Sequence, residues 1–345
     1  MSSARADRSG PGATSGPTDA DPFVRAGVVD RSDRGKLRLT GPQALWFCDQ
    51  LLTNQVVSLE EGSGAEALLL TPHGRITALL RLLHVDEEVL ADTEPGLAGG
   101  IADFLRGRVF STRVEIAEVT AELGIVSVLG PAADEVVRAA GFPVPGPEEH
   151  ASVRRGSAVA ARVLRPVRGV DLFTPRAEVS GTVAGLGAAG GAVASAGDYE
   201  SLRVREGLAR DRIDFDEGYL PQEAALERAV HFAKGCYLGQ EAVAMTQRGR
   251  VKRRLRLLRF EGEARLGPVR RLGEEVGRVT SAAAGSGIAT LRTSVAPGER
   301  VDVGDAAASA ALVEELPGSV SGPRLPSARE LREGLAGGAG PRRSS

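Results

Sequence analysis

Apolar and polar residues alternate along this chain in patterns that change from strand-like to helical and back. Residues 36–39 alternate as a half-buried strand does, and residues 44–52 place their apolar side chains on one helical face that includes Cys48. Thr40 and Gln43 precede this face with the spacing of a capping box. We therefore predict a strand followed by a helix, with Cys48 as a small residue of the core.

The interleaving of strand and helix patterns continues to about residue 250. Apolar runs at 67–71 and 76–85 flank residues 72–75, Pro-His-Gly-Arg, which predicts a β-hairpin. The Gly- and Ala-rich residues 185–197 are predicted to form a surface loop. The remaining predicted elements are strands at 89–91, 113–119, 124–129, 158–164 and 170–173, and helices at 99–109, 132–140, 199–208 and 220–227. This order predicts the α+β class.

The pattern changes after residue 250. Residues 251–260 are basic and alternating, and the short apolar runs that follow are separated by glycine, at 276–280, 288–291, 300–303 and 310–314. Several short strands with little helix predict a small β-barrel or sandwich. Both ends of the chain are poor in apolar residues and are predicted to be disordered. The predicted organisation is a leader at 1–21, an α+β body at 22–250, a barrel at 251–316 and a tail at 317–345.

The composition describes an ordinary globular chain. It has 345 residues, 42% hydrophobic residues and a net charge of -2, which argues against nucleic-acid binding driven by bulk charge. Two cysteines are too few for a disulfide framework or a self-contained metal site, so no resident metal is predicted. No apolar run of about 18 residues and no signal peptide are evident, so we expect a cytoplasmic monomer without membrane contact. Abundant Arg, Ala and Gly beside few lysines indicate a bacterial source with a GC-rich genome.

The stretch Lys234-Gly235-Cys236-Tyr237-Leu238-Gly239-Gln240-Glu241, here called the octapeptide, concentrates rare residues. The chain has three lysines, two cysteines and three tyrosines, and one of each lies within four consecutive positions. A helix is predicted to begin after Gly239. A neighbouring ammonium and a helix N-terminus both favour a thiolate, so Cys236 is predicted to be a reactive or ligating thiol with Lys234 as its electrostatic partner. The alternative interpretation of Cys236 is a structural thiol in a tight loop.

Three other groups of residues have simpler interpretations. His231 lies in an apolar stretch and is interpreted as a packed histidine rather than a general base. The acidic residues between 211 and 217 lack the spacing of a calcium loop and are interpreted as a solvated loop. The basic residues between 248 and 259 could hold phosphates, including those of tRNA, or a polycarboxylate tail. The alternative interpretation of these basic residues is a solvated edge strand whose charges prevent it from pairing with a strand of another chain.

The octapeptide, KGCYLGQE, resembles the signature of the YgfZ family of folate-binding proteins, which are relatives of the glycine-cleavage T-protein and act in iron–sulfur cluster assembly or repair. Further similar motifs occur in the family's order: Asp30-Arg31-Ser32, Leu51-Leu52-Thr53-Asn54, Leu220-Pro221-Gln222-Glu223 and Glu275–Ser281. The resemblance covers about residues 22–315. It implies a T-protein-like body of two α+β subdomains, closed by a C-terminal β-barrel around a central cavity.

The chain departs from T-proteins at two positions. T-proteins carry a catalytic Asp soon after a glycine pair, and the matching stretch here contains Ala78 and Leu79. T-proteins also carry an acid where this chain has Arg205. Without these acids, activation of a folate amine and polarisation of an aminomethyl group are not expected. Arg205, which is counted among the cofactor-binding residues, could reorient or repel the pterin.

The resemblance implies a tetrahydrofolate-binding accessory protein for iron–sulfur client proteins, without independent turnover. Cys236 would be the reactive thiol, and Gly235, Tyr237, Gly239, Gln240 and Glu241 would shape the folate-facing wall. One alternative is a tetrahydrofolate-dependent aminomethyl or methyl transferase. Another is a tRNA-modification-linked binding protein that uses the basic strand.

Overall fold

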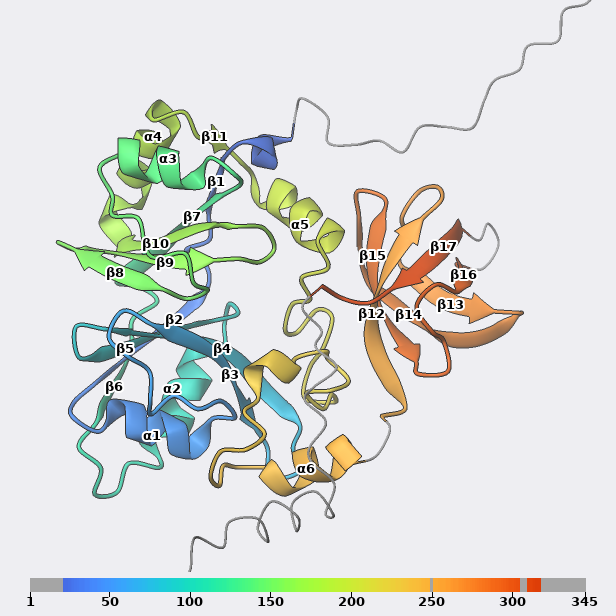
Figure 1. The fold of residues 1–345 in the computed structure, drawn as a ribbon, viewed down its shortest axis with the longest axis horizontal. Coiled ribbons are helices and arrows are strands. Elements are labelled where there is room, and N and C mark those ends of the chain that lie inside the picture. Colours follow the sequence, from blue (N-terminus) through green and yellow to red (C-terminus); the bar gives the residue numbers. More distant parts are fainter. Residues whose placement is uncertain (1–20, 249–250, 305–308, 318–345) are drawn as a thin grey trace, which may run out of the picture.

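The computed structural model describes residues 21–248, 251–304 and 309–317. The predicted disordered leader and tail lie outside these residues, apart from Asp21 and Pro317. Strands and helices interleave through the body, and the chain then enters a closed β-barrel (Figure 1). The predicted α+β class with a C-terminal barrel is therefore confirmed. No helix in the described part of the chain is long and apolar enough to cross a membrane.

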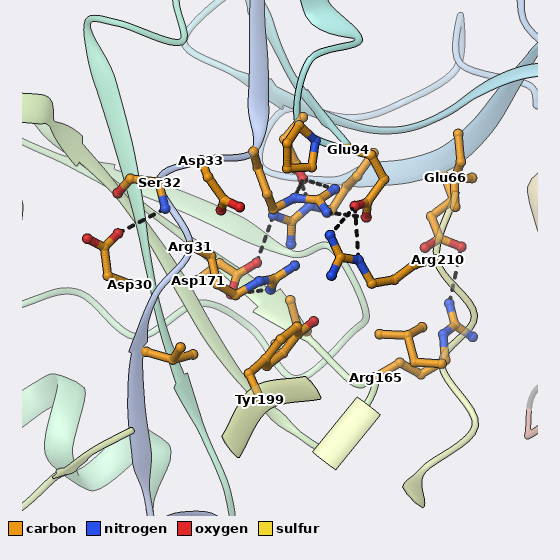
Figure 2. A pocket seen from close by; sticks show the side chains of 18 of the residues that line it. Asp30, Arg31, Ser32, Asp33, Glu66, Glu94, Arg165, Asp171, Tyr199 and Arg210 are labelled. Atoms are coloured by element: carbon orange, nitrogen blue, oxygen red, sulfur yellow. Dashed lines mark hydrogen bonds and ion pairs between the residues drawn. The ribbon is translucent and has the colours of Figure 1, made fainter. Parts of the chain in front are cut away.

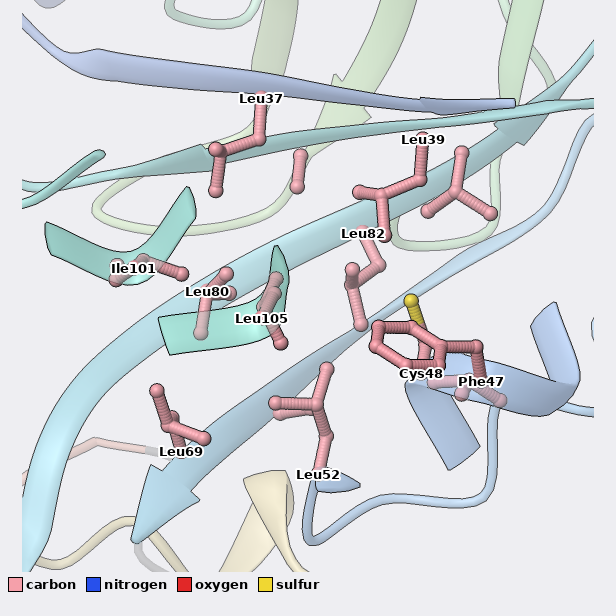
Figure 3. Close-up of a cluster of buried hydrophobic side chains, with 14 of the residues drawn as sticks. Leu37, Leu39, Phe47, Cys48, Leu52, Leu69, Leu80, Leu82, Ile101 and Leu105 are labelled. Atoms are coloured by element: carbon pink, nitrogen blue, oxygen red, sulfur yellow. The ribbon is translucent and has the colours of Figure 1, made fainter. Parts of the chain in front are cut away.

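One sheet of the body is antiparallel and carries two helices on its outer face. Its strand order is β3-β4-β5-β2-β6, with β2 (Gly35–Thr40), β3 (Gly64–Leu70), β4 (Ile76–Val85), β5 (Glu88–Thr93) and β6 (Glu115–Glu118). Helices α1 (Ala44–Leu51) and α2 (Ala98–Arg106) cover this face. Leucines of the sheet pack there against Phe47, Cys48 and Leu105 (Figure 3). Cys48 is only 2% exposed, which confirms its predicted place in the core.

A second sheet packs face to face against the first. Its order is β11-β1-β7-β10-β9-β8, with β1 (Gly27–Asp30), β7 (Leu123–Leu129), β8 (Ser152–Arg155), β9 (Ala158–Val163), β10 (Gly169–Pro175) and β11 (Ala192–Val193). Leu83 and Leu90 of the first sheet meet Ile125 and Phe173 of the second in one buried cluster. Helices α3 (Ala133–Ala139) and α4 (Val179–Ala188) cover the outer face, so the body has four layers.

The barrel closes in the order β12-β15-β14-β13-β16-β17. Its strands are β12 (Arg253–Phe260), β13 (Gly267–Arg271), β14 (Glu274–Ala283), β15 (Ser286–Arg292), β16 (Arg300–Val303) and β17 (Ser309–Glu314). Helix α5 (Ala196–Arg205) lies between the body and the barrel and contacts β14 and β15. Helix α6 (Gln240–Arg248) ends just before the barrel. Three short 3-10 helices complete the fold, at Pro22–Val24, Arg176–Glu178 and Glu227–Ala229.

Some local predictions were wrong. The side-chain oxygen of Gln43 accepts a hydrogen bond from the Arg113 N–H at 2.7 Å, so no capping box forms at the start of α1. The helix predicted at 220–227 is replaced by turns and a 3-10 helix, because Ala225 adopts a left-handed conformation (φ 57°). The loop predicted at 185–197 contains the end of α4 and the short strand β11. Strand β13 was not predicted.

The interpretation of residues 211–217 as a solvated loop was wrong for Asp211, which is 3% exposed, and for Asp214. The Asp214 carboxylate is 1% exposed and joins the body to the barrel. It accepts hydrogen bonds from the Arg203 guanidinium of α5 at 2.9 Å and from the Ser281 hydroxyl of β14 at 2.7 Å. Because buried charges are retained only when they are paired, this contact fixes the position of the barrel against α5.

Candidate functional site

A cavity of about 340 Å³ lies at the centre of the body, here called the central cavity. The connection between β1 and β2, strands β4, β5 and β10, and helix α5 all contribute to its wall (Figure 2). This volume falls within the range of small-molecule sites, which is roughly 300–1,000 Å³. Exposed residues lie at its mouth, among them Asp30, Asp33 and Ala196, and buried residues line its interior.

The wall of the central cavity is highly charged but balanced. It contains seven arginines and seven carboxylates: Arg31, Arg34, Arg81, Arg165, Arg176, Arg210 and Arg228, with Asp30, Asp33, Glu66, Asp92, Glu94, Glu149 and Asp171. Equal numbers of the two signs favour a ligand recognised by directed hydrogen bonds over one held by net charge.

Arg81 organises the floor of the central cavity. It lies opposite Asp92 in the register of β4 and β5, and its Nε donates to Asp92 Oδ2 at 2.6 Å. Its Nη2 also reaches Asp171 Oδ2 of β10 at 2.8 Å, so one guanidinium joins the two sheets. Burial alone would raise the pKa of Asp92, but Arg81 and Arg34 outweigh it and lower the pKa to about 2. The floor therefore keeps its charges fixed over the ordinary pH range.

An aromatic ring and several arginines lie together on another part of the wall. The Arg31 guanidinium lies over the Tyr199 ring, 4.5 Å from its centroid. Glu94 accepts from Arg34 at 2.9 Å and from Arg210 at 2.9 Å, which holds both arginines in place. Figure 2 shows Arg31, Tyr199 and Arg210 around the same space. A planar ring system can stack on such a surface.

Lys234 does not face the central cavity. Its ammonium donates to the carbonyl oxygens of Asp49 at 2.6 Å, Leu52 at 3.0 Å and Asn54 at 2.7 Å, and it pairs with Asp49 Oδ1 at 3.2 Å. These carbonyls lie at the end of α1 and just beyond it. Burial lowers the pKa of Lys234, and Asp49 opposes that change. The lysine therefore secures the octapeptide to α1, and its contacts are with these oxygens rather than with Cys236.

The rest of the octapeptide packs as a tight connection into α6. Tyr237 is buried in a cluster that includes residues of β3 and β12. Gly239 has φ +82°, and a Cβ there would lie 2.5 Å from the Thr71 oxygen, so the turn accepts only glycine. Gln240 Nε2 donates to the Lys234 oxygen at 3.3 Å. The predicted helix start after Gly239 is confirmed by α6.

Cys236, Gly235 and Glu241 lie at the surface of the octapeptide. No residue of the octapeptide is among those that line the central cavity. The role of Cys236 as a reactive thiol stays a prediction. A folate-facing wall made of Gly235, Tyr237, Gly239, Gln240 and Glu241 is an alternative to binding in the central cavity and also stays a prediction.

Arg205 and the basic strand are occupied by acidic partners. Arg205 lies at the end of α5, pairs with Asp21 at 2.7 Å and with Glu206 at 3.1 Å, and does not line the central cavity. Its predicted contact with the pterin finds no support in this position. On β12, arginines pair with carboxylates of the same chain: Arg253 with Glu223, Arg254 with Glu227, Arg256 with Glu315 and Arg259 with Glu314. These pairs do not favour a tRNA surface, and the alternative of a charged edge strand was wrong as well, because β12 pairs with both β15 and β17 in the closed barrel.

The lining of the central cavity was mostly missed from the sequence, although a signal was present. Arg81, Asp92 and Asp171 interrupt apolar strands, at Leu80-Arg81-Leu82, Ala91-Asp92-Thr93 and Val170-Asp171-Leu172. Charged residues are rarely buried unless they are paired. Three single charges inside apolar strands would have indicated a buried polar site.

Part of the chain matches a family model, and two curated proteins are similar over most of it. Residues 24–144 match the GCVT N-terminal domain. The chain is 26% identical over 267 residues to "Putative transferase At1g60990, chloroplastic" of Arabidopsis thaliana. The matched region covers 74% of this chain and 61% of that protein, so the chain spans less than two thirds of that protein's length. It is 29% identical over 271 residues to an aminomethyltransferase of Rubrobacter xylanophilus, 75% of this chain and 72% of that protein.

Among solved structures, the fold is similar to that of the glycine cleavage system aminomethyltransferase T from Bartonella henselae. The TM-score is 0.77 at 20% sequence identity, and the match covers 87% of this chain and 88% of that one. The chain therefore has a T-protein-like fold, as the sequence predicted.

Proposed function

We propose that this protein binds a reduced folate, a derivative of tetrahydrofolate, in the central cavity. The observation that carries the proposal is a polar cavity of about 340 Å³, walled by Tyr199 and paired charges, inside a T-protein-like fold. A pterin is planar and carries several hydrogen-bond donors and acceptors, which suits an aromatic wall beside fixed carboxylates and guanidinium groups. The names of the similar curated aminomethyltransferases support the same ligand class.

The finer proposal is an accessory role in iron–sulfur cluster assembly or repair, with Cys236 as the reactive thiol. It is supported by the resemblance of the octapeptide to the YgfZ signature and by the exposure of Cys236 beside the start of α6. In this role the folate would be bound in the central cavity and the thiol would act at the surface. Client proteins would approach the exposed octapeptide rather than the cavity.

Transfer of a one-carbon unit is the second candidate, because similar proteins are named aminomethyltransferase. The residues at the matching position argue against it here. Ala78 is fully buried in the core of the first sheet, and Leu79 presents an apolar side chain to the central cavity. The catalytic Asp that T-proteins carry at this point therefore has no counterpart in the matching stretch, and a catalytic acid or base must lie within hydrogen-bond reach of the substrate.

Calorimetric titration with tetrahydrofolate, beside a turnover assay with an aminomethyl-carrying lipoyl donor, tests both candidates on one sample. Saturable one-to-one binding without sustained turnover supports the accessory proposal. Multiple turnover would support the transferase instead, and no binding would overturn both. The iron–sulfur role is tested by complementation: a host that lacks its own copy should regain iron–sulfur enzyme activity with the wild type and not with Cys236→Ser.

A further inference from the structure

Five residues that line the central cavity, here called the inner cluster, are Glu66, Glu149, His150, Arg165 and Arg228, of which His150 is buried and the others are half-buried. Arg228 Nε donates to Glu66 Oε2 at 2.6 Å, and Arg165 Nη2 pairs with Glu149 Oε1 at 2.8 Å and with Glu66 Oε2 at 3.4 Å. The two guanidinium groups and the two carboxylates balance one another. The inner cluster therefore has no spare charge with which to hold an anionic group.

Two polar atoms of the inner cluster have no hydrogen-bond partner within the described part of the chain. They are His150 Nδ1 and Arg165 Nε, and both are buried. His150 as a whole is 8% exposed. Buried polar atoms in native proteins are nearly always satisfied, so two unpartnered atoms on residues that line one cavity mark a place where a ligand group or an ordered water molecule would bind.

The backbone of His150 adopts an energetically unfavourable conformation. Its φ is +65°, a left-handed conformation that non-glycine residues rarely adopt, and its N–H donates to the Arg162 oxygen at 3.0 Å. This bond continues the pairing of β8 with β9, whose far end leads to Arg165. Such strain persists where the surrounding structure enforces it, and it is concentrated at ligand sites.

The two atoms have complementary hydrogen-bonding capacity. Arg165 Nε carries a proton and can only donate. Burial, with Arg81 and Arg165 nearby, lowers the pKa of His150 to about 4, although Glu66 and Asp92 oppose the change. A neutral imidazole can accept through one ring nitrogen while it donates through the other. Together the two atoms offer one donor and one acceptor, which is the hydrogen-bonding complement of a lactam edge.

We propose that His150 and Arg165 form a subsite that binds the lactam edge of the ligand, with Arg165 Nε donating to the carbonyl and His150 Nδ1 accepting from the ring N–H. This inference rests on the proposed function and extends it, because a pterin carries such an edge at its 4-oxo position. It orients the ring system inward, towards the inner cluster, and leaves the remainder of the folate pointing to the mouth of the cavity. A water molecule could satisfy the same two atoms, and the experiment separates the two cases.

The test combines a ligand analogue with protein variants. Folic acid and its 4-amino-4-deoxy analogue differ at the lactam, so calorimetric dissociation constants for both are measured with the full chain. The variant His150→Gly removes the imidazole and accepts the left-handed backbone, and His150→Asn retains hydrogen bonding there. His84→Asn is the matched control, because this half-buried histidine contacts the Leu59 oxygen and lies outside the cavity. Melting temperatures show that each variant is folded.

The proposal predicts that wild type and His84→Asn bind folic acid at least tenfold more tightly than the 4-amino analogue. His150→Gly should lose at least tenfold in affinity for folic acid, and the preference between the two compounds should disappear. His150→Asn should retain part of the affinity for folic acid and part of the preference for folic acid over the 4-amino analogue. Folic acid binding that is unchanged in His150→Gly, with the preference intact, would overturn the subsite and leave the proposed function standing. Absence of tetrahydrofolate binding to the wild type would overturn the proposed function and the subsite with it.

Discussion

Arg81 of β4 and Asp171 of β10 form an ion pair at 2.8 Å that joins the two sheets of the body. Both side chains are almost fully buried, and Asp171 also accepts from the Ser127 hydroxyl at 2.5 Å. The pair lies in the floor of the central cavity, where it connects the two halves of the candidate site. Stability and ligand binding are therefore coupled at this point of the fold.

Asp171→Asn should lower the free energy of unfolding by about 1.5–3 kcal/mol, because Arg81 keeps its pair with Asp92 but loses the buried charged hydrogen bond that joins the two sheets. Urea denaturation measures the change. The matched control is Asp103→Asn, which breaks an ion pair with Arg106 in which the Asp103 side chain is 79% exposed. Such a pair contributes about 0–1 kcal/mol. Equal losses in the two variants would show that Arg81 and Asp171 contribute no more than a surface pair.

Lys234→Ala should be destabilising, by about 2–4 kcal/mol, because three carbonyls and a carboxylate at the end of α1 lose their cation. Lys234→Arg should not restore the loss, since a planar guanidinium does not fit a site built for a compact ammonium. Thermal and urea unfolding measure both variants. Lys252→Ala is the control, because this lysine is exposed. A Lys234→Ala protein as stable as the control would contradict the structural role.

Cys236 should be alkylated by iodoacetamide well before Cys48. Cys236 is exposed, whereas burial and the nearby Asp49 raise the pKa of the Cys48 thiol to about 12 despite Lys234. Mass spectrometry of timed samples identifies the modified residue. Cys236→Ser should abolish the fast phase, and Cys48→Ala should retain it. Labelling of Cys48 first in the folded protein would show that the octapeptide shields its thiol.

His150 should make stability depend on pH between about 4 and 6.5. Because burial lowers its pKa to about 4 in the folded state, the unfolded chain binds more protons in this window, and stability is lost as the pH falls. The change in the pKa of His150 corresponds to about 3 kcal/mol of unfolding free energy. Asp211 acts with the opposite sign, since burial raises its pKa to about 6.

The difference between variants isolates the contribution of His150. Melting curves of wild type and His150→Asn are compared from pH 4 to 8, with His84→Asn as the control. The two curves should diverge progressively below pH 6.5, with the variant losing less stability on acidification. Parallel curves would show that His150 is not held neutral by the fold.

The sequence predicted the elements whose signals are local. Alternation in residues 251–260 and the glycine-separated runs after them predicted the barrel, and the helical face around Cys48 predicted α1. The prediction of a helix at 220–227 was wrong because Ala225 adopts a left-handed backbone conformation. That conformation is imposed by tertiary contacts, which a local sequence pattern does not report. The octapeptide was singled out because its residues are rare, yet rarity does not distinguish a reactive site from a structural anchor such as Lys234.

The resemblance implied a central cavity, but most residues of its wall were not assigned from the sequence because the wall is assembled from distant segments. Asp92, Glu149 and Arg228 lie far apart in the sequence and meet only through the stacking of two sheets. Their charges look solvated until the pairing partners are known. Asp214 shows the same difficulty, since its partners Arg203 and Ser281 come from a helix of the body and a strand of the barrel.

The central claim is that a reduced folate binds in the central cavity and not at the octapeptide, and two tryptophan substitutions test it most directly. Ala196 is exposed at the mouth of the cavity, and Ala233 is exposed beside Lys234. Surface substitutions at such positions change stability little, so both variants should fold. Calorimetric titration with tetrahydrofolate should show at least tenfold weaker binding to Ala196→Trp, because the indole obstructs the opening, and unchanged binding to Ala233→Trp. Unchanged binding to Ala196→Trp with loss in Ala233→Trp would place the folate at the octapeptide and contradict the account.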